Sequence, residues 1–340
     1  MKNLNIIDKV VFLINSVVAL LSLLSYVTYY VPPKSFPLIS MVSLSVPLFI
    51  ILNIFFVIYW LLKLKKQVII SLLVLAVGYN YVTSFYKFTS EESSNSEDAF
   101  TLMSYNVRLF NLYDWIKEDS IPSKIQDFIA EEAPSILCFQ EHDSSTGLSF
   151  TVYPYRHQTN TSNHKSELVI LSTYKILNSG FINFSNSANS AIYADVLIKS
   201  DTIRVYNVHL QSSGINPNVE SLDKEQSNRL LKRLSSTFNA QQSQAEIVAD
   251  HVSQSPHKVL MCGDFNNTAY SYVYRILKGD LLDAFDSSGR GFGRTFNFRY
   301  FPVRIDFILA DDHFSVESFQ NYSVPYSDHF PILSQFSLDK

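Results

Sequence analysis

The chain has 340 residues, of which 47% are hydrophobic, 14% aromatic and only 17% charged, and its formal net charge is −4. Soluble domains carry about 25% charged residues, so this composition excludes a disordered or low-complexity protein and indicates that part of the chain does not face water. The charge is unevenly divided, because residues 1–90 carry +6 and residues 91–340 carry −10. The two segments are therefore chemically different.

Three apolar stretches without charged residues occupy the beginning of the chain, at 10–31, 35–62 and 67–86. A helix needs about 20 apolar residues to cross a bilayer, so each stretch is long enough. The pattern predicts a membrane anchor with three transmembrane helices over residues 1–88. Three buried helices of a soluble core are the alternative. A cleaved signal peptide does not fit, because its apolar region spans only about 7–15 residues.

The lysines beside these stretches predict how the anchor is oriented. Lys2 and Lys9 precede the first stretch, and Lys63, Lys65 and Lys66 lie between the second and the third. Because cytoplasmic loops are enriched in lysine and arginine, the N-terminus is expected in the cytoplasm. Three spans would then place the rest of this multi-pass protein on the extracytoplasmic side, which is the periplasm in a cell with two membranes.

A polar, acidic and serine-rich segment at 89–99 reads as a flexible linker. Residues 100–340 are numerous enough for one large domain with its own core. Helical periodicity covers 121–132 and 223–252. Short runs rich in β-branched and aromatic residues predict strands at 101–107, 135–141, 167–172, 192–198, 203–210, 258–265 and 304–310.

Two hairpins are predicted from neighbouring runs, one joining 168–172 to 181–184 and the other joining 192–198 to 203–210. Strands outnumber helices, which favours sheets with helices packed outside them. Cys138 and Cys262 lie within apolar strand runs and are expected to be buried thiols. A disulfide between them stays open at this stage, because sequence alone does not give the distance between two cysteines.

Polar residues that suit catalysis gather where the predicted strands end. A strand interior excludes a carboxylate unless the carboxylate is paired or bound, so several such residues at strand ends indicate a shared pocket. The residues are Asn106, Glu141, Asn207, His209, Asp264, Asn266, Asp306, Asp328 and His329.

The segments around these residues read, in chain order, SYNVR, CFQE, YNVHLQS, CGDFNN, RIDFIL and SDHFPI. This ordered set resembles the endonuclease/exonuclease/phosphatase superfamily over about residues 100–338, and with the apolar stretches it is similar to a membrane-anchored bacterial branch. The resemblance implies an α+β fold in which a two-sheet β-sandwich is flanked by helices in four α/β/β/α layers. It also implies hydrolysis of a phosphate ester by in-line attack of water, with Mg²⁺, or Mn²⁺ as an alternative, as the cofactor.

The resemblance assigns roles to the metal-binding and base positions. Glu141 would be the principal metal ligand, because Mg²⁺ prefers oxygen ligands. Asn106 would support the metal or a phosphate oxygen, and Asp328 would bind the same metal or a second one. Asp264 would orient and deprotonate the attacking water.

The remaining polar positions are expected to act on the phosphate. Asn266 would donate to a phosphate oxygen, and His329 would stabilise the developing charge while Asp306 fixes its tautomer. His209 would be a second acid or phosphate contact. Asn207 would belong to the catalytic set or support the pocket as a strand-edge amide.

Three further residues have two interpretations each. Glu167 opens a predicted strand and would orient His209, unless it is a solvent-facing carboxylate. Arg294 and Arg304 flank the stretch that leads to Asp306, and each would bind a substrate phosphate or form a structural salt bridge.

These observations predict a membrane-anchored, metal-dependent phosphoesterase whose substrate is expected to be a phosphodiester. The alternative is a catalytically inactive binding or sensing domain on the same fold. A lipid headgroup and a nucleic acid both stay open as the substrate. The charge of −10 argues against tight binding to DNA, whereas an anchor holds the domain near lipid headgroups. The bilayer is the expected partner, and no obligate protein partner is evident.

Overall fold

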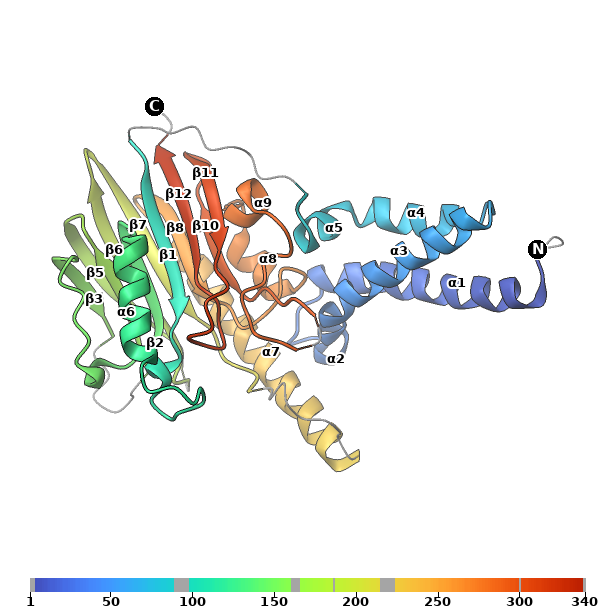
Figure 1. Cartoon of the computed structure of the whole chain (residues 1–340), viewed down its shortest axis with the longest axis horizontal. Coiled ribbons are helices and arrows are strands. Elements are labelled where there is room, and N and C mark those ends of the chain that lie inside the picture. The colour runs from blue at the N-terminus through green and yellow to red at the C-terminus, as the bar shows by residue number, and fades with distance from the viewer. Residues whose placement is uncertain are drawn as a thin grey trace.

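The computed structural model describes residues 4–88, 98–159, 166–185, 187–214, 224–299 and 301–338. It consists of a bundle of N-terminal helices that projects from a two-sheet sandwich (Figure 1). Most of the predicted linker, at 89–97, lies outside the described residues.

Two of the N-terminal helical segments are long and apolar enough to cross a membrane, Ile6–Tyr30 and Pro37–Leu62. The first consists of α1 (Ile6–Val27) and the 3₁₀ turn η1 (Thr28–Tyr30); the second consists of α2 (Pro37–Ser40), η2 (Met41–Ser45) and α3 (Val46–Leu62). Water-soluble proteins rarely expose large contiguous apolar patches. This bundle exposes many large apolar side chains, among them Leu13, Val17, Leu20, Leu24, Phe55, Ile58, Leu61 and Leu73.

The third apolar stretch is not a single helix, so the prediction of three transmembrane helices is wrong at this point. Helix α4 (Val68–Val77) and helix α5 (Tyr79–Phe85) meet at an angle of 79°. The chain bends at Gly78, where a Cβ atom would lie 2.4 Å from the ring of Tyr26. The close contact with this ring requires a glycine, and a glycine also weakens a helix at that point.

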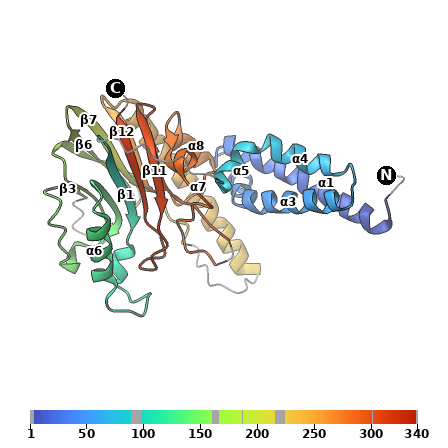
Figure 2. The ribbon, with the colours of Figure 1, turned by 45° about the horizontal axis from the view of Figure 1, so that its top comes forward.

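Buried polar side chains join the helices of the bundle. Asn15 on α1 donates to Ser71 on α4 at 2.7 Å and accepts from the Trp60 indole on α3 at 2.9 Å. Asn53 on α3 donates to Ser22 on α1 at 2.7 Å. Such interhelical hydrogen bonds replace part of the hydrophobic driving force that is missing between helices in lipid. They set the register in which α1, α3 and α4 pack side by side (Figure 2).

Within the described residues, the sandwich contains two mixed sheets of six strands each. The first sheet has the order β11 (Phe314–Asn321), β12 (Ile332–Leu338), β1 (Phe100–Asn106), β2 (Ile136–His142), β4 (Glu167–Ser172) and β3 (Tyr155–Gln158). The second has the order β5 (Ile176–Asn183), β6 (Ser190–Ile198), β7 (Asp201–His209), β8 (Lys258–Asp264), β10 (Asp306–Ala310) and β9 (Leu282–Asp283). Each sheet has one parallel pair near its centre, β1 with β2 and β7 with β8.

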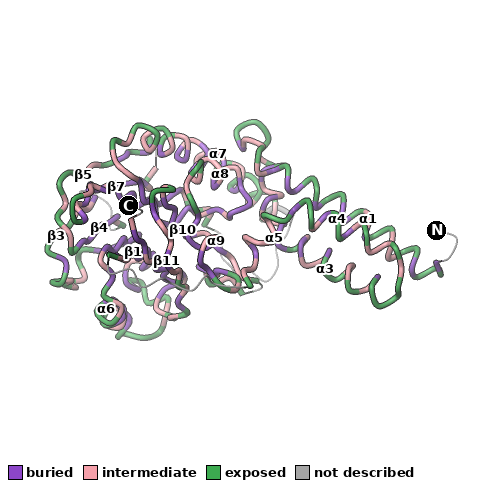
Figure 3. The backbone as a smooth tube through the Cα atoms, turned by 90° about the horizontal axis from the view of Figure 1, so that it is seen from above, coloured by how far each residue is buried: buried purple, intermediate pink, exposed green. Residues whose placement is uncertain are grey.

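Helices cover the outer face of each sheet, which confirms the predicted four-layer arrangement. Helix α6 (Ile121–Glu132) packs on the first sheet, and α7 (Lys224–Ser253) and α8 (Tyr272–Lys278) pack on the second. Burial is concentrated between the layers (Figure 3). Cys138 and Cys262 lie in the core between the sheets as free thiols in contact, and burial raises the pKa of Cys138. The sequence pattern predicted the core between the two sheets well, because each strand alternates between inward-facing and outward-facing residues.

One of the two predicted hairpins is wrong. Strand β4 pairs with β2 and β3 in the first sheet, whereas β5 pairs with β6 in the second. The short turn after Ser172 therefore carries the chain from one sheet to the other, and a local sequence pattern does not distinguish such a crossing from a hairpin. The predicted pairing of 192–198 with 203–210 is confirmed as β6 with β7.

The helix bundle is docked on the sandwich beside α7, α8 and α9 (Ala284–Ser288). Side-chain and backbone hydrogen bonds join the two parts at Lys34 with Gln242, Tyr29 with Arg275, Ser84 with Asp286 and Lys87 with Gly291. The helices are therefore fixed against one region of the sandwich, whatever path residues 89–97 take.

Gly263 on β8 generates a prediction about stability. Its φ is +137°, and a Cβ atom there would lie 1.9 Å from the carbonyl oxygen of Val208 on β7. Gly263→Ala is expected to lower the free energy of unfolding by about 3 kcal/mol or more, since both the backbone angle and the contact oppose a side chain. Thermal unfolding of the detergent-purified full chain would measure the effect.

Gly147 provides the matched control, because its φ is +70° but a Cβ atom would have nothing within 4 Å. Gly147→Ala is expected to cost about 1 kcal/mol, the cost of the backbone angle alone. Equal losses in the two variants would contradict the importance of the contact between β8 and β7.

Candidate active site

The polar cluster lies at the ends of four strands. Along each strand the inward-facing residues in the core are apolar, and at its end the inward-facing residues are polar. Asn106 ends β1, His209 ends β7, Asp264 ends β8, and Asp306 begins β10. Alternate residues of a strand share a face, and these four continue the rows that supply the core between the sheets. Because β10 runs antiparallel to β8, with Asp306 opposite Asp264, all four side chains reach the same edge of the sandwich.

Glu141 reaches the cluster through a break in the alternation of β2. Leu137 and Phe139 pack on the outer side with α6, so a regular strand would point Glu141 outward as well. The pairing of β2 with β4 shifts between Phe139 and His142, and Glu141 has a φ of +52°. A β-bulge of this kind redirects a side chain, and it turns Glu141 into the cavity. Strained backbone of this type concentrates at functional sites.

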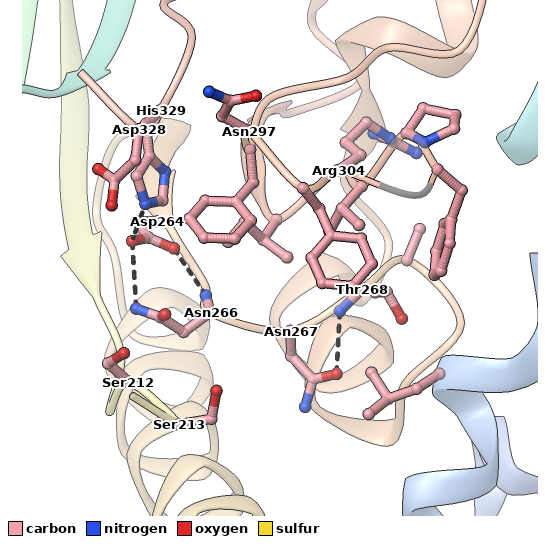
Figure 4. A pocket seen from close by; sticks show the side chains of 18 of the residues that line it. Ser212, Ser213, Asp264, Asn266, Asn267, Thr268, Asn297, Arg304, Asp328 and His329 are labelled. Atoms are coloured by element: carbon pink, nitrogen blue, oxygen red, sulfur yellow. Dashed lines mark hydrogen bonds and ion pairs between the residues drawn. The ribbon is translucent and has the colours of Figure 1, made fainter. Parts of the chain in front are cut away.

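Asp264 is the hub of the cluster. Its Oδ1 accepts from the backbone N–H of Asn266 at 2.8 Å, and its Oδ2 accepts from Asn106 Nδ2 at 3.0 Å. The Nε2 atoms of His209 and His329 lie 3.6 Å and 3.7 Å from the same Oδ2. Figure 4 shows His329 and Asn266 beside Asp264. Burial raises the pKa of Asp264 to about 6, although both histidines oppose the shift. The carboxylate is thus ionised at neutral pH and close to the pKa that suits a general base.

His329 carries a positive charge that two carboxylates hold in place. Its Nδ1 lies 2.9 Å from Oδ2 of Asp306. Burial lowers the pKa of His329, but Asp306 and Asp264 outweigh burial and raise the pKa to about 10. The imidazolium therefore presents Nε2–H toward the centre of the cluster at neutral pH, as the sequence interpretation of Asp306 and His329 expected.

His209 is in the opposite protonation state. Its side chain is buried, and its Nε2 has no hydrogen-bond partner among the described residues. The nearest carboxylate oxygens are those of Asp264 at 3.6 Å and Glu141 at 3.8 Å. Burial lowers the pKa of His209, so the ring is neutral at pH 7. Its unpartnered nitrogen is available to an oxygen atom of a ligand.

Asn106 and Asn266 hold the carboxylates in position. Asn106 Nδ2 lies 3.0 Å from Asp264 and 3.4 Å from Oε1 of Glu141, so one amide serves both acids. Asn266 Nδ2 donates to Asp264 at 3.1 Å and to the carbonyl of Leu210 at 3.0 Å. These contacts use amide hydrogens that the sequence interpretation of Asn266 expected on a phosphate oxygen, and the amide oxygen of Asn106 accepts from the backbone N–H of Arg108 at 3.1 Å.

Asn207 lies one inward-facing position deeper than His209 and does not line the cavity. Its Oδ1 accepts from Gln140 at 2.7 Å, and its Nδ2 donates to the carbonyls of Phe139 and Val169 at 2.8 Å and 3.0 Å. Asn207 therefore ties the second sheet to the first beneath the cluster. This placement matches the supporting role that was the alternative for this residue.

Glu167 does not contact His209, so the predicted pairing is wrong. Its Oε2 lies 3.6 Å from Nδ1 of His142 and accepts from Ser144. The bulge in β2 places His142 opposite Glu167 in the pairing with β4. Glu167 shares the outer face of β4 with Val169, which packs with α6, so its side chain points away from the cluster between the sheets.

The two predicted phosphate-binding arginines are placed differently. Arg304 is buried between the rings of Phe285 and Phe307, and its NH1 donates to Asp283 at 2.7 Å. Arg304 lines the cavity at a distance from the cluster, whereas Arg294 is not among the residues that line it. Arg294 stacks on Phe330 and bonds Asn297.

Arg108 is a cation of the site that the sequence interpretation missed. Its NH1 lies 3.2 Å from Asp328, and its guanidinium stacks 4.3 Å from the ring of Trp115. All three residues line the cavity. Arg108 belongs to the SYNVR segment, so the motif contained the signal. Asp328 was predicted as a metal ligand, and in the structure its carboxylate forms the ion pair with Arg108.

The charges of the cluster suit a divalent cation. Four carboxylate side chains gather here, those of Glu141, Asp264, Asp306 and Asp328, and their basic neighbours include His329 and Arg108. The atoms of Asp264, Asp306 and His329 lie within 4.8 Å of one another, as a metal site requires. However, a protonated histidine cannot ligate a metal. Glu141 lines the cavity, and its neighbours are the amide of Asn106 at 3.4 Å and the neutral ring of His209 at 3.8 Å, so it is the better carboxylate ligand.

Residues 103–329 match the Endonuclease/Exonuclease/phosphatase family. The chain belongs to this family. Members of the family depend on divalent metal ions, which agrees with the acidic and histidine residues of the cluster. Residues 8–85 match a domain of unknown function. No protein with a curated function matches the chain.

Solved structures with low sequence identity share the fold of this family member. A humanized TDP2 from Danio rerio is 16% identical with a TM-score of 0.55, and the match covers 71% of this chain and 100% of that one. A family protein from Bacteroides thetaiotaomicron is 17% identical with a TM-score of 0.54, covering 71% and 98%. The catalytic domain of human Nocturnin, solved with a sulfate anion, is 17% identical with a TM-score of 0.53, covering 75% and 98%.

The pair of His329 and Asp306 generates a prediction that does not depend on the substrate. Asp306→Asn removes the carboxylate that stabilises the imidazolium, so the proton is lost at lower pH. The pKa of His329, about 10 in the native protein, is expected to fall by at least about one pH unit. Nuclear magnetic resonance of the full chain with ¹³C-labelled histidine would follow the titration in metal-free detergent solution.

Loss of the signal in His329→Gln would assign the resonance. Asp312→Asn is the control, because this carboxylate belongs to a side chain that is 78% exposed and contacts His313 instead. An unchanged titration of His329 in Asp306→Asn would show that Asp306 does not hold the charge.

Proposed function

We propose that the protein is a membrane-anchored phosphodiesterase that uses a divalent metal ion, Mg²⁺ in the first instance, to hydrolyse a phosphodiester. In this proposal residues 1–88 form the anchor, 89–99 a linker and 100–340 the catalytic domain, as expected for a membrane-anchored bacterial branch of the family. The observation that carries the proposal is the convergence of an ionised base, a charged histidine and a neutral histidine at Asp264, His329 and His209.

Asp264 would act as the general base for the attacking water. Its two oxygens are fixed by Asn266 and Asn106, so a water that donates to the carboxylate is held in one direction. The water oxygen bonds to phosphorus, and its proton passes to Asp264. One ester bond between phosphorus and oxygen breaks, which leaves a phosphomonoester and an alcohol once the leaving oxygen has gained a proton.

The two histidines would act on the phosphate from different positions. His329 presents a charged N–H whose orientation is fixed by Asp306, so it stabilises negative charge on a phosphate oxygen. His209 has an unpartnered nitrogen close to both Asp264 and Glu141. It can donate to the leaving oxygen or to a second phosphate oxygen.

Glu141 would hold the metal ion, assisted by the oxygen-rich surroundings of the cavity. The bound cation would supply charge neutralisation and polarisation of the phosphate. The amide of Asn106 holds Glu141 beside Asp264. Asn106 would therefore orient the carboxylate of Glu141 and would not bind the metal itself.

The helix bundle would anchor the enzyme in the bilayer with the catalytic domain outside the cytoplasm. The bundle exposes apolar side chains along its length, and its two ends differ in charge. Lys9 lies in the first turn of α1, and Lys63, Lys65 and Lys66 lie between α3 and α4. Figure 1 shows the start of α1 and the connection from α3 to α4 at the end of the bundle remote from the sandwich. Positive residues favour the cytoplasmic side, so the sandwich would face the opposite side.

The role of Asp264 predicts the outcome of a substitution. Asp264→Asn is expected to reduce hydrolysis of bis(p-nitrophenyl) phosphate in the presence of Mg²⁺ by about 10²-fold or more, because the general base is lost. The rate of nitrophenolate release by the detergent-purified full chain would be measured, with Asp312→Asn as the exposed control. A variant that folds and keeps the native rate would contradict the assignment.

The proposed orientation predicts the behaviour of reporter fusions. Alkaline phosphatase, which folds into an active enzyme only outside the cytoplasm, is expected to be active when fused after residue 95. The same reporter is expected to be inactive when fused after Leu64, between α3 and α4. Activities in cells would be compared at equal expression, and the reverse pattern would overturn the orientation.

A further inference from the structure

A single cavity of about 880 Å³ connects the catalytic cluster to the helix bundle. Glu141, Asp264 and His329 line one end of it, and Leu44, Pro47 and Phe85 of the helices line the other. Figure 4 shows the labelled acids and histidine across the cavity from the ribbon of the N-terminal helices. Ligand-binding cavities have volumes of about 300–1,000 Å³, so this one can hold a molecule larger than a phosphate group.

The wall between the two ends is aromatic. Phe292, Phe298 and Phe301 come from the segment that leads to β10, and all three line the cavity. The side chains of Phe292 and Phe301 remain 44% and 36% exposed. Exposed aromatic side chains beside a polar centre indicate a ligand with a polar end and an apolar remainder.

The apolar end of the cavity lies at the level where a bilayer surface would meet the bundle. Leu44 lies in η2, Pro47 is the second residue of α3, and Phe85 ends α5; Figure 1 shows α5 and the start of α3 at the end of the bundle that touches the sandwich. Tyr26 and Tyr81 stack at the same end, with ring centroids 4.6 Å apart. Tyrosine is enriched at membrane interfaces, so this end corresponds to the headgroup region.

Arg304 supplies an independent indication of a ligand inside the cavity. The residue is 7% exposed, and its Nε and NH2 groups have no hydrogen-bond partner among the described residues. Asp283 bonds NH1 at 2.7 Å, and Asp286 lies 3.7 Å from NH2, so the positive charge is already balanced. Nε and NH2 together carry three N–H bonds without an acceptor, buried at the cavity wall, and beside balanced charge they suit a neutral acceptor such as an ester carbonyl.

We propose that the substrate of this site is a glycerophospholipid of the adjoining leaflet, which enters the cavity without leaving the bilayer entirely. Its phosphodiester lies at Asp264 and His329, its ester carbonyls lie near Arg304, and its acyl chains pass between the aromatic segment and the helices. Water adds to phosphorus and one ester bond breaks, so the products are a phosphomonoester and an alcohol. This inference rests on the proposed phosphodiesterase function and names its substrate class.

A cavity-filling substitution on the helices separates lipid from soluble substrates. Leu44→Trp is expected to lower kcat/KM about tenfold or more for vesicles of phosphatidylethanolamine and phosphatidylglycerol, because the apolar passage is blocked. Hydrolysis of bis(p-nitrophenyl) phosphate, which does not need this passage, is expected to stay within about twofold of the native rate. Release of the phosphomonoester would be measured with the full chain.

Leu48→Trp is the matched control, since Leu48 lies one helical turn further along, is 53% exposed and does not line the cavity. It is expected to leave both activities unchanged. Failure to hydrolyse the soluble ester would refute the proposed function itself. Hydrolysis of the soluble ester and of DNA, but not of vesicle lipid, would leave that function standing and overturn the lipid inference.

A binding measurement keeps the inference testable if Leu44→Trp does not fold. A phosphatidylcholine with a photoreactive acyl chain would be incorporated into vesicles with the Asp264→Asn full chain in the presence of EDTA. Cross-links are expected in the peptides that contain Phe292, Phe298 and Phe301. Cross-links confined to the outward-facing residues of α1 and α3 would overturn the inference.

Discussion

The carboxylate of Asp264 is buried where the two sheets meet, and its charge has to be compensated there by groups from both of them. An isolated charge in such a place would cost several kcal/mol. Asn106 comes from the first sheet and His209 from the second, Asn266 follows β8 of the second sheet, and His329 precedes β12. The relative position of the two sheets therefore decides whether the charge is stable, and the amide of Asn207 fixes that position from below.

Two histidines close to one carboxylate differ in charge, one positive and one neutral, because their other neighbours differ. His329 has Asp306 at its other ring nitrogen and stays protonated, whereas the buried Nε2 of His209 has no close hydrogen-bonded acid and stays neutral. Environments that separate the pKa values of like groups assign acid and base roles within one site. The carboxylate of Asp306 is thus as important to the chemistry as the groups that face the cavity, because it holds the positive charge of His329 in position.

Much of this arrangement could be predicted from the sequence, because strand periodicity and ordered motifs place polar residues at strand ends. Asp264, Asp306, His209 and His329 come together as that reasoning predicts. The errors arise where the chain does not continue as a regular pattern suggests. Glu167 lies on the outer face of β4 beside His142, the chain crosses to the other sheet after Ser172, and the bend at Gly78 divides the third apolar stretch. Such departures depend on packing between segments that are distant in sequence.

The contacts of the helix bundle reach the catalytic residues through a short series of bonded groups. Ser84 on α5 donates to Asp286 at 3.0 Å, and Asp286 lies beside Arg304. Thr295 Oγ1 accepts from the backbone N–H of Asp306 at 3.0 Å, which ties the aromatic segment to the residue that orients His329. The segment 291–305 thus forms the aromatic wall of the cavity and contacts the helices through Phe292 and Phe85. It also supports the charged His329 through Thr295. Because one segment serves all three purposes, the docking of the helices and the geometry of the active site are set by the same packing.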